Sequence, residues 1–335
     1  MTAHDATAAV PPQVRRSFPD AVQLPPSLLR RPPQPARRVL PPPPAGRDLT
    51  TAPTPARTGS GRLAVCGSCL FLASGTKGDI LVVDPARPDG PHRVLGRHGA
   101  SVSALLAYGG VLLSTGSDGF LVGRAVTGAD ELAAVVGCHP TGITAALVAP
   151  DGRLVTAGHD GQVLAWRPGR REVLATHPGG IEAVAVLGSD SVVTAGRDGR
   201  LLHRPASAGD VVELGRRRGE ITLALASAGR GRLMTAGGQR GVVRLWNDLG
   251  IGGWPEELGA HGSWVLALVV LDADHVVAVG GEHVTVWDLA TGDHSRIALR
   301  PGLHAASAVA LPTGDLAVAG TDPTVDVLTA QQLAA

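Results

Sequence analysis

A short phrase recurs seven times along this chain at an almost constant spacing. In each copy an apolar run ends in small residues and a glycine-containing turn, as in "STGSDG" at 114–119 and "TAGHDG" at 156–161. The glycines that mark the turn are Gly75, Gly116, Gly158, Gly196, Gly237, Gly280 and Gly320. Successive glycines are 41, 42, 38, 41, 43 and 40 residues apart. So regular a period predicts seven copies of one structural unit, and it overrides the two domains that a length of 335 residues would otherwise suggest.

Each unit has the composition of β-strands. Runs such as "SVSALLA", "GITAALV" and "WVLALVVL" are short and rich in Val, Leu and Ala, as expected of strands buried on both faces. Glycine interrupts these runs too often for stable helices. Asp-Gly pairs, as at 118–119 and 160–161, supply the positive φ that tight hairpin turns need. Units of four strands and about 40 residues are typical of propeller blades, so we predict an all-β, seven-bladed propeller over residues 61–335 with no helix.

Residues 1–60 differ from the rest of the chain. They hold fourteen of the 26 prolines and eight arginines against three aspartates, so their net charge is 8 − 3, or about +5. Such a segment has too little apolar surface to offset the entropy of ordering, and we predict a Pro/Arg-rich, mostly disordered leader. Within it, "SFPDAVQLPPSLLRR" at 17–31 is suited to docking as an extended peptide, on a partner or on its own propeller.

The third strand of several units ends in a tryptophan. The dipeptide is Trp-Asp at 287–288, and it is altered to Trp-Arg at 166–167 and Trp-Asn at 246–247. On these residues and the period, residues 61–330 resemble the WD40-repeat family. The resemblance implies a structural tetrad in each blade, in which a His, a Ser or Thr, an Asp and a Trp share hydrogen bonds. Blade three holds the complete set of His139, Thr156, Asp160 and Trp166.

The other blades keep parts of this tetrad. The fragments are His98, Ser114 and Asp118; His177, Thr194 and Asp198; Thr235 and Trp246; His261, Glu282 and Trp287; and His304 and Asp322. Arginine takes the tryptophan place in blades two and four, as Arg124 and Arg204, and we expect both to extend toward solvent or to pair with a carboxylate.

The last unit supplies three strands and then ends, which leaves one sheet edge unpaired. In the family, one terminus commonly provides the outermost strand of the blade made by the other. The segment "ARRVL" at 36–40 is similar to "HRVL" at 92–95 and "REVL" at 171–174, and prolines follow it without interrupting it. We therefore predict 36–40 as the closing strand. The alternatives are 47–52 and a ring without such a strand.

The resemblance also implies that the loops before the inner strands and the turns between second and third strands share one binding face. Trp264 is a large aromatic where sister repeats carry Gly or Ser. It either plugs the channel or anchors a partner. We hypothesise an Arg/Trp patch that binds an acidic protein or peptide, with a solvated charge run as the alternative. The patch consists of Trp264, Arg197, Arg216, Arg217, Arg218, Arg240 and Glu220.

The opposite face has an insertion, "NDLGIGGWPEEL" at 247–258, in blade five. Its Trp254 lies between a glycine-rich run and Pro255. We expect Trp254 to cap the blade edge, and a second anchor for a partner is the alternative.

Two further function classes are weaker alternatives. The sequence has no Gly-x-Ser-x-Gly nucleophile motif, HExxH, phosphate loop or EF-hand loop. For an enzyme of the lyase or hydrolase kind, the candidates to face the channel mouth are His159, Glu220, Glu282 and His283, and a shared face alone does not make a site. Nucleic-acid binding is disfavoured by a net charge of +1 and 3% aromatic residues. Three cysteines, Cys66, Cys69 and Cys138, make neither a disulfide framework nor a zinc site, so we expect no metal or cofactor.

The sequence thus favours a non-catalytic scaffold or adaptor. The start "MTAHDATAAVPPQVRR" lacks the apolar core of a secretory signal, and no run of about 18 apolar residues predicts a membrane span, so we expect a cytoplasmic protein. A single lysine among many arginines indicates a GC-rich bacterial genome. By analogy alone, the chain is similar to propeller components that accompany ATPases, proteases or kinases.

Overall fold

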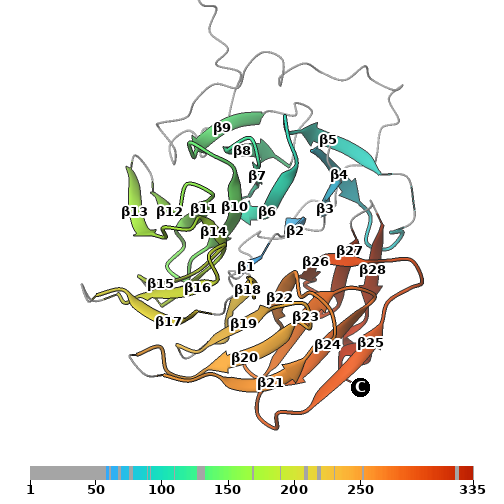
Figure 1. Ribbon diagram of the computed structural model, residues 1–335. Coiled ribbons are helices and arrows are strands. Elements are labelled where there is room, and N and C mark those ends of the chain that lie inside the picture. The colour runs from blue at the N-terminus through green and yellow to red at the C-terminus, as the bar shows by residue number, and fades with distance from the viewer. Residues whose placement is uncertain are drawn as a thin grey trace, which may run out of the picture.

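The computed structural model describes residues 58–59, 62–66, 69–74, 78–88, 90, 92–108, 110–126, 133–167, 170–188, 190–206, 210–216, 220–229, 231–250, 253–320 and 324–334. These residues form seven antiparallel sheets arranged as a ring about one axis (Figure 1). The all-β, seven-bladed propeller predicted from the repeat is confirmed.

Each blade is a meander in which consecutive strands pair. Blades one to three consist of β2 Leu63–Cys66, β3 Cys69–Ser74, β4 Asp79–Val83 and β5 Arg93–Arg97; β6 Val102–Tyr108, β7 Val111–Gly116, β8 Phe120–Ala125 and β9 Ala133–Cys138; and β10 Ile143–Val148, β11 Leu154–Gly158, β12 Gln162–Arg167 and β13 Arg170–Thr176. Blades four to six consist of β14 Ile181–Leu187, β15 Ser191–Gly196, β16 Arg200–Arg204 and β17 Val212–Arg216; β18 Thr222–Ser227, β19 Leu233–Gly237, β20 Val242–Trp246 and β21 Glu256–Ala260; and β22 Ala267–Val270, β23 His275–Gly280, β24 His283–Asp288 and β25 His294–Ala298. Blade seven consists of β26 Ala305–Ala310, β27 Leu316–Gly320 and β28 Val325–Leu328.

The hydrophobic core is divided among the blade interfaces. Among the described residues, each pair of neighbouring blades shares one cluster of buried Val, Leu, Ile and Ala side chains. Between blades three and four, for example, Val155 and Val163 pack with Ile181 and Val184. The strands are apolar on both faces because each sheet is covered on both sides by a neighbour. This explains why the sequence runs are continuously apolar and do not alternate.

The ring closes through the same kind of packing between its last and first blades. Leu63 and Leu72 of blade one lie in one buried cluster with Val309 and Val325 of blade seven. One hydrogen bond crosses the same junction, from the Arg62 backbone N–H to the Ser307 hydroxyl at 3.0 Å. Closure within the described residues therefore rests on side-chain packing, and it uses no strand pairing between blades one and seven.

One short strand of the leader lies at the centre of the ring. β1, Thr58–Gly59, pairs antiparallel with β22, the inner strand of blade six, with Thr58 opposite Leu268 and Gly59 opposite Ala267. Figure 1 shows β1 near the axis, beside β18 and β22. Blade six is thereby a five-stranded sheet, whereas blade seven has three strands in the described part of the chain. The closing strand predicted at 36–40 and its alternative at 47–52 lie outside the described residues.

The expectation that no helix follows residue 61 is wrong at the C-terminal end. Helix α2, Ala330–Leu333, begins after Thr329, whose hydroxyl accepts from the Gln332 backbone N–H while the Gln332 side chain accepts from the Thr329 N–H. This capping box is the helix start signal that "TAQQ" carries in the sequence. Leu333 is buried against blades six and seven, which holds the helix on the ring.

The blade-five insertion packs on blade four, but through a residue other than the expected one. Leu249 is buried beside Leu214 of β17, and its carbonyl accepts a hydrogen bond of 2.8 Å from His203 Nδ1 of β16. The His203 Nε2 atom lies 2.8 Å from the Ser191 hydroxyl. Trp254 is 88% exposed, so the expectation that Trp254 caps the blade edge is wrong. A single leucine fits the narrow space between the two blades, whereas the bulky indole lies outside it.

The cysteines are free, and Cys66 and Cys69 lie opposite each other across β2 and β3. Burial, followed by the neighbouring Cys69, raises the pKa of the Cys66 thiol. The described residues contain no group of three or more His, Cys, Asp or Glu side chains placed to hold a metal ion. They also include no helix with the length and apolar character needed to cross a bilayer.

We propose that residues 36–40 pair with the outer edge of β28. Removing residues 1–45 is expected to lower the thermal unfolding midpoint by several degrees, because an added strand contributes on the order of 1–3 kcal/mol. Removing only residues 1–34 is expected to leave the midpoint unchanged. Calorimetry of the two truncated chains checks the proposal, and equal midpoints for both would exclude 36–40 as the closing strand.

Candidate functional site

The four tetrad residues of blade three form one continuous hydrogen-bonded chain. Trp166 Nε1 donates to the Thr156 hydroxyl at 2.9 Å, and that hydroxyl lies 2.8 Å from His139 Nε2. His139 Nδ1 lies 3.1 Å from both carboxylate oxygens of Asp160. These contacts tie the third strand, the second strand, the turn after it and the loop before the inner strand into one blade.

The direction of each bond follows from the chemistry of the groups. An indole N–H only donates and a carboxylate only accepts, so His139 carries its proton on Nδ1 and accepts the Thr156 hydroxyl hydrogen on Nε2. Burial lowers the pKa of His139, although Asp160 opposes this shift, so the neutral imidazole is favoured. Both ring nitrogens of His139 and the Asp160 carboxylate are therefore occupied by hydrogen bonds within the tetrad, as expected of a structural network.

Close approach of the preceding blade completes the packing of the indole. Gly137 of β9 faces the Trp166 ring, and a Cβ at that position would lie 2.5 Å from the ring. Glycine is required there because any side chain would displace the tryptophan.

Blade two replaces the indole with a buried guanidinium. Arg124 is 4% exposed, and it donates to the Ser114 hydroxyl and to the Arg97 carbonyl, the latter at 2.9 Å. The expectation that Arg124 extends toward solvent is wrong, and the tetrad hydroxyl and a backbone oxygen are among its partners. His98 keeps its tetrad contacts with Ser114 and Asp118. Arg204 of blade four is exposed, as expected.

Blade six uses a different hydroxyl. Its second strand has Ala278 where blade three has Thr156, and Thr285 lies directly opposite Ala278 on the third strand. His261 Nδ1 lies 2.8 Å from the Thr285 hydroxyl, and His261 Nε2 donates to the Gly280 carbonyl at 2.8 Å. In blade six the hydroxyl that contacts the histidine therefore comes from the third strand, whereas in blade three it comes from the second strand.

Two other expected members of the tetrad fragments lie elsewhere. Glu282 and His304 are exposed, and the Glu282 carboxylate lies 3.8 Å from His304 Nε2 between the loops of blades six and seven. Their assignment to the buried networks is therefore wrong. Asp322 lies outside the described residues. The Trp287 Nε1 atom is buried with no hydrogen-bond partner among the described residues, and its ring stacks on His294 with a centroid distance of 5.6 Å.

The groups that an enzyme at the channel mouth would need are separately engaged. His283 Nε2 donates to the His261 carbonyl at 2.8 Å and its ring stacks on the His261 ring. Glu220 forms an ion pair of 3.7 Å with Arg244, whose side chain is largely buried. His159 contacts Arg197. These contacts engage His283, Glu220 and His159 with three different partners.

Trp264 lies in the loop that enters blade six. Its backbone packs tightly on the end of β23, because a Cβ on Gly280 would lie 1.9 Å from the Trp264 carbonyl oxygen. The side chain remains 38% exposed. The close backbone contact fixes the position of the loop, so the indole is held in place without being buried.

Arg197 projects from the turn between β15 and β16. Its Nε donates to the Glu182 carboxylate of β14, and its NH2 group lies 3.4 Å from His159 Nε2 in the corresponding turn of blade three. The side chain is still 58% exposed. Sequence reasoning did not identify Glu182 as its partner, although Glu182 is the one acidic residue in the otherwise apolar run "GIEAVAVL".

Arg240 is connected to the Trp264 loop by a backbone hydrogen bond. The Gly262 N–H donates to the Arg240 carbonyl at 2.8 Å, which links the blade-five turn to the loop that carries Trp264. The Arg240 side chain is exposed. Arg216 ends β17, opposite Arg200, and its side chain lies outside the described part, as do Arg217 and Arg218. The structure thus joins Arg240 to the Trp264 loop and places Arg197 with blades three and four.

The tetrad gives a prediction that compares two blades. Thr156→Val is expected to lower the free energy of unfolding by about 2–4 kcal/mol, since it leaves both the Trp166 N–H and the His139 imidazole without their partner. Thr235→Val is the matched control, because Thr235 accepts only from Trp246, at 3.2 Å, among the described contacts. Its expected cost is about 1–2 kcal/mol. Urea unfolding measures both, and equal costs would contradict a continuous chain in blade three.

The buried histidine of blade six predicts a pH dependence. Burial lowers the pKa of His261 from 6.5 to about 4, against the opposing effect of the Gly280 carbonyl. Between these pH values the unfolded chain binds more protons than the folded one, so stability is full above pH 6.5 and falls as the pH drops toward 4. The expected contribution is roughly 3 kcal/mol.

Unfolding free energies at pH 7.5, 5.5 and 4.5 test this dependence. His261→Asn is expected to be less stable at pH 7.5 and to show a shallower loss on acidification. His304→Asn, which changes an exposed histidine, is expected to keep the wild-type slope. An unchanged slope in the His261 variant would refute the assignment.

Comparison with known proteins finds a similar repeat and a similar fold. Residues 131–167 match the family model described as WD domain, G-beta repeat, which covers β9 to β12. No curated protein matches the chain. Among solved structures, the crystal structure of the WD40 beta propeller domain of Doa1 is similar, with a TM-score of 0.67 and 17% sequence identity over 85% of this chain and 97% of that chain. The chain is a seven-bladed β-propeller with a WD40 repeat at residues 131–167.

Proposed function

We propose that this protein is a non-catalytic scaffold that binds an acidic protein or peptide on the face carrying Trp264, Arg197 and Arg240. Propellers of the WD40 type generally serve as protein-interaction scaffolds, which supports the broad assignment. The observation that carries the specific proposal is the Trp264 indole, which is 38% exposed on a loop whose backbone is held rigidly. Rigid aromatic side chains lose little entropy on binding and are frequent anchors of interfaces.

The arginines provide the charge selectivity. Arg197 has its Nε directed to Glu182, which leaves further guanidinium N–H groups on an exposed side chain for a carboxylate of the partner. Arg240 is exposed beside the Trp264 loop. An acidic ligand long enough to span both positions would pair with both arginines. Arg216, Arg217 and Arg218 belong to the proposed patch through their place in the sequence before blade five.

Glu220 has a supporting role in this proposal. Its carboxylate pairs with Arg244, and Arg244 pairs in turn with Glu257 at 3.6 Å. The Glu220 side chain also lies against Gly238 in the turn that precedes Arg240. We assign Glu220 to holding that turn in place, because a carboxylate in direct contact with an acidic partner would repel it.

Charge reversal tests the proposal. A library of acidic peptides supplies the probe, and the tightest-binding peptide is titrated against the full chain. Arg197→Glu combined with Arg240→Glu is expected to weaken binding by at least about tenfold, since each reversal removes an attractive pair and adds repulsion. Trp264→Ala is expected to weaken binding by a similar factor.

Arg87→Glu is the matched control, because Arg87 is an exposed arginine between β4 and β5, on the opposite face, and its ion pair among the described residues is a local one with Asp84. It is expected to leave the affinity unchanged, and circular dichroism confirms folding of each variant. Equal affinity of the wild-type chain and the Arg197/Arg240 variant would overturn the proposed site, whichever peptide is used.

A further inference from the structure

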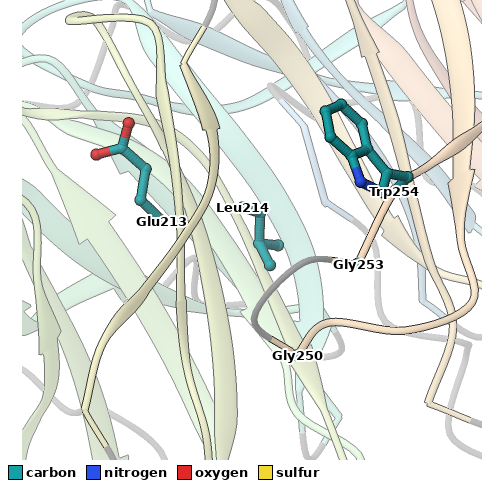
Figure 2. Close-up of a pocket in the computed structure, with 5 residues that line it drawn as sticks. All are labelled: Glu213, Leu214, Gly250, Gly253 and Trp254. Carbon is teal, nitrogen blue, oxygen red and sulfur yellow. The ribbon is translucent and has the colours of Figure 1, made fainter.

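A second aromatic surface lies away from the Trp264 face, where the blade-five insertion meets blade four. Trp254 borders a small hollow of about 160 Å³, which Glu213, Leu214, Gly250 and Gly253 also line. Figure 2 shows the indole on one side of the hollow and the β17 side chains on the other. We call these five residues the Trp254 surface. The indole is 88% exposed beside this hollow, and no hydrogen bond or ring contact holds it among the described residues.

The insertion is held firmly enough to present this surface. Leu249 is buried between blades, and the His203 Nδ1 hydrogen bond to its carbonyl fixes the chain just before the glycines. A second hydrogen bond of 2.8 Å, from the Gly250 N–H to the Asp248 carboxylate, closes the turn. After Trp254, the chain enters β21 and joins the blade-five sheet. The exposed indole is therefore carried by a segment anchored on both sides.

Exposed acidic side chains surround the Trp254 surface. Glu213 lines the hollow itself. The segments on either side of it, β17 with the residues before it and the insertion with the start of β21, carry the exposed residues Asp210, Asp248, Glu256 and Glu257. Of the arginines on the adjoining strands, Arg244 of β20 is paired with Glu257 at 3.6 Å, and two others belong to β16. Arg200 is already paired with Asp198 and Glu213, at 3.5 and 3.7 Å, and Arg204 is exposed. The local balance is acidic, so the surface favours a basic ligand.

The leader of the same chain has the complementary chemistry. Residues 1–60 carry about five net positive charges, whereas the rest of the chain carries 1 − 5, or about −4. Within the leader, residues 17–31 combine Phe18, the Pro25–Pro26 pair and Leu28 with the basic pair Arg30–Arg31. Proline-rich segments bind tryptophan-lined surfaces because the proline ring stacks on the indole and the extended backbone loses little entropy.

We propose that leader residues 17–31 dock in cis on the Trp254 surface of their own propeller. The prolines and apolar side chains cover the indole and Leu214, and the arginines face the surrounding carboxylates. This contact is separate from the proposed acidic-partner site, which lies on the face of Trp264. It makes the leader an element of the folded protein and limits its availability to other proteins.

The chain is long enough for this contact. The described part of the leader, β1, lies on the ring axis, and Arg31 precedes Thr58 by 58 − 31, or 27, residues. An extended chain of that length spans up to roughly 90 Å.

Photo-crosslinking in the full chain tests the proposal. The photoreactive aromatic residue p-benzoylphenylalanine replaces Trp254, which is exposed and makes no hydrogen bond within the described residues. Irradiation of the purified protein is expected to link position 254 to residues 17–31, as mapped by peptide mass spectrometry. A mixture of isotopically light and heavy chains distinguishes links within one molecule from links between two.

Two variants of the crosslinking chain sharpen the result. Glu256→Arg is expected to lower the crosslink yield about fivefold, because it reverses a charge next to the hollow. Glu172→Arg is the matched control, since Glu172 is exposed at the equivalent register of blade three, opposite Ala165 as Glu256 is opposite Leu245. The control is expected to leave the yield unchanged.

Three outcomes would overturn the proposal. They are no link from position 254 to residues 17–31, a link only to the leader of another chain, and equal yields in the two charge variants. Acidic-peptide binding on the Trp264 face is measured independently, so failure here leaves that proposal standing.

Discussion

Apolar contact between neighbouring blades is the interaction on which the rest of this structure depends. Each sheet is buried on both faces by its neighbours, so no blade has a complete core of its own. Seven interfaces must therefore form together, and the last of them joins Val309 and Val325 to Leu63 and Leu72. The ring geometry then brings loops from distant parts of the sequence onto shared faces. Both proposed binding surfaces exist only because this packing holds their blades side by side.

In blades two, three, four and six, a hydrogen-bonded histidine ties the entry loop to the sheet, and its partners vary from blade to blade. Blade three uses Thr156 and Trp166, blade two replaces the indole with Arg124, and blade six moves the hydroxyl to Thr285. Buried polar groups require partners, and several residue types can supply one at the same place. This tolerance explains how the repeat diverged in sequence while its period persisted. It also accounts for most of the His and Asp residues that would otherwise suggest catalysis.

The period and the apolar runs were sufficient to predict the number of blades, because seven equal spacings allow few other folds. Local substitutions were harder to predict. Arg124 was expected to extend toward solvent or to pair with a carboxylate, yet Gly96 of β5 in the neighbouring blade leaves room for its buried side chain. Trp254 was expected to cap the blade edge, yet Leu249 fills the space between the blades. His159 was not recognised as a partner of Arg197, since that contact joins two blades, and Glu182 was missed although it lies on a strand of the same blade. These errors share one cause, which is that side-chain placement depends on neighbours in adjacent strands and blades that the sequence does not place.

The central claim is that packing between blades seven and one closes a single cooperative ring. Native-state hydrogen exchange tests it most directly, through the amide protons of β27 in blade seven and β11 in blade three. If the ring is cooperative, both strands exchange with the same free energy, equal to that of global unfolding. Exchange of β27 at a lower free energy, while β11 stays protected, would show that blade seven opens locally and would contradict the account.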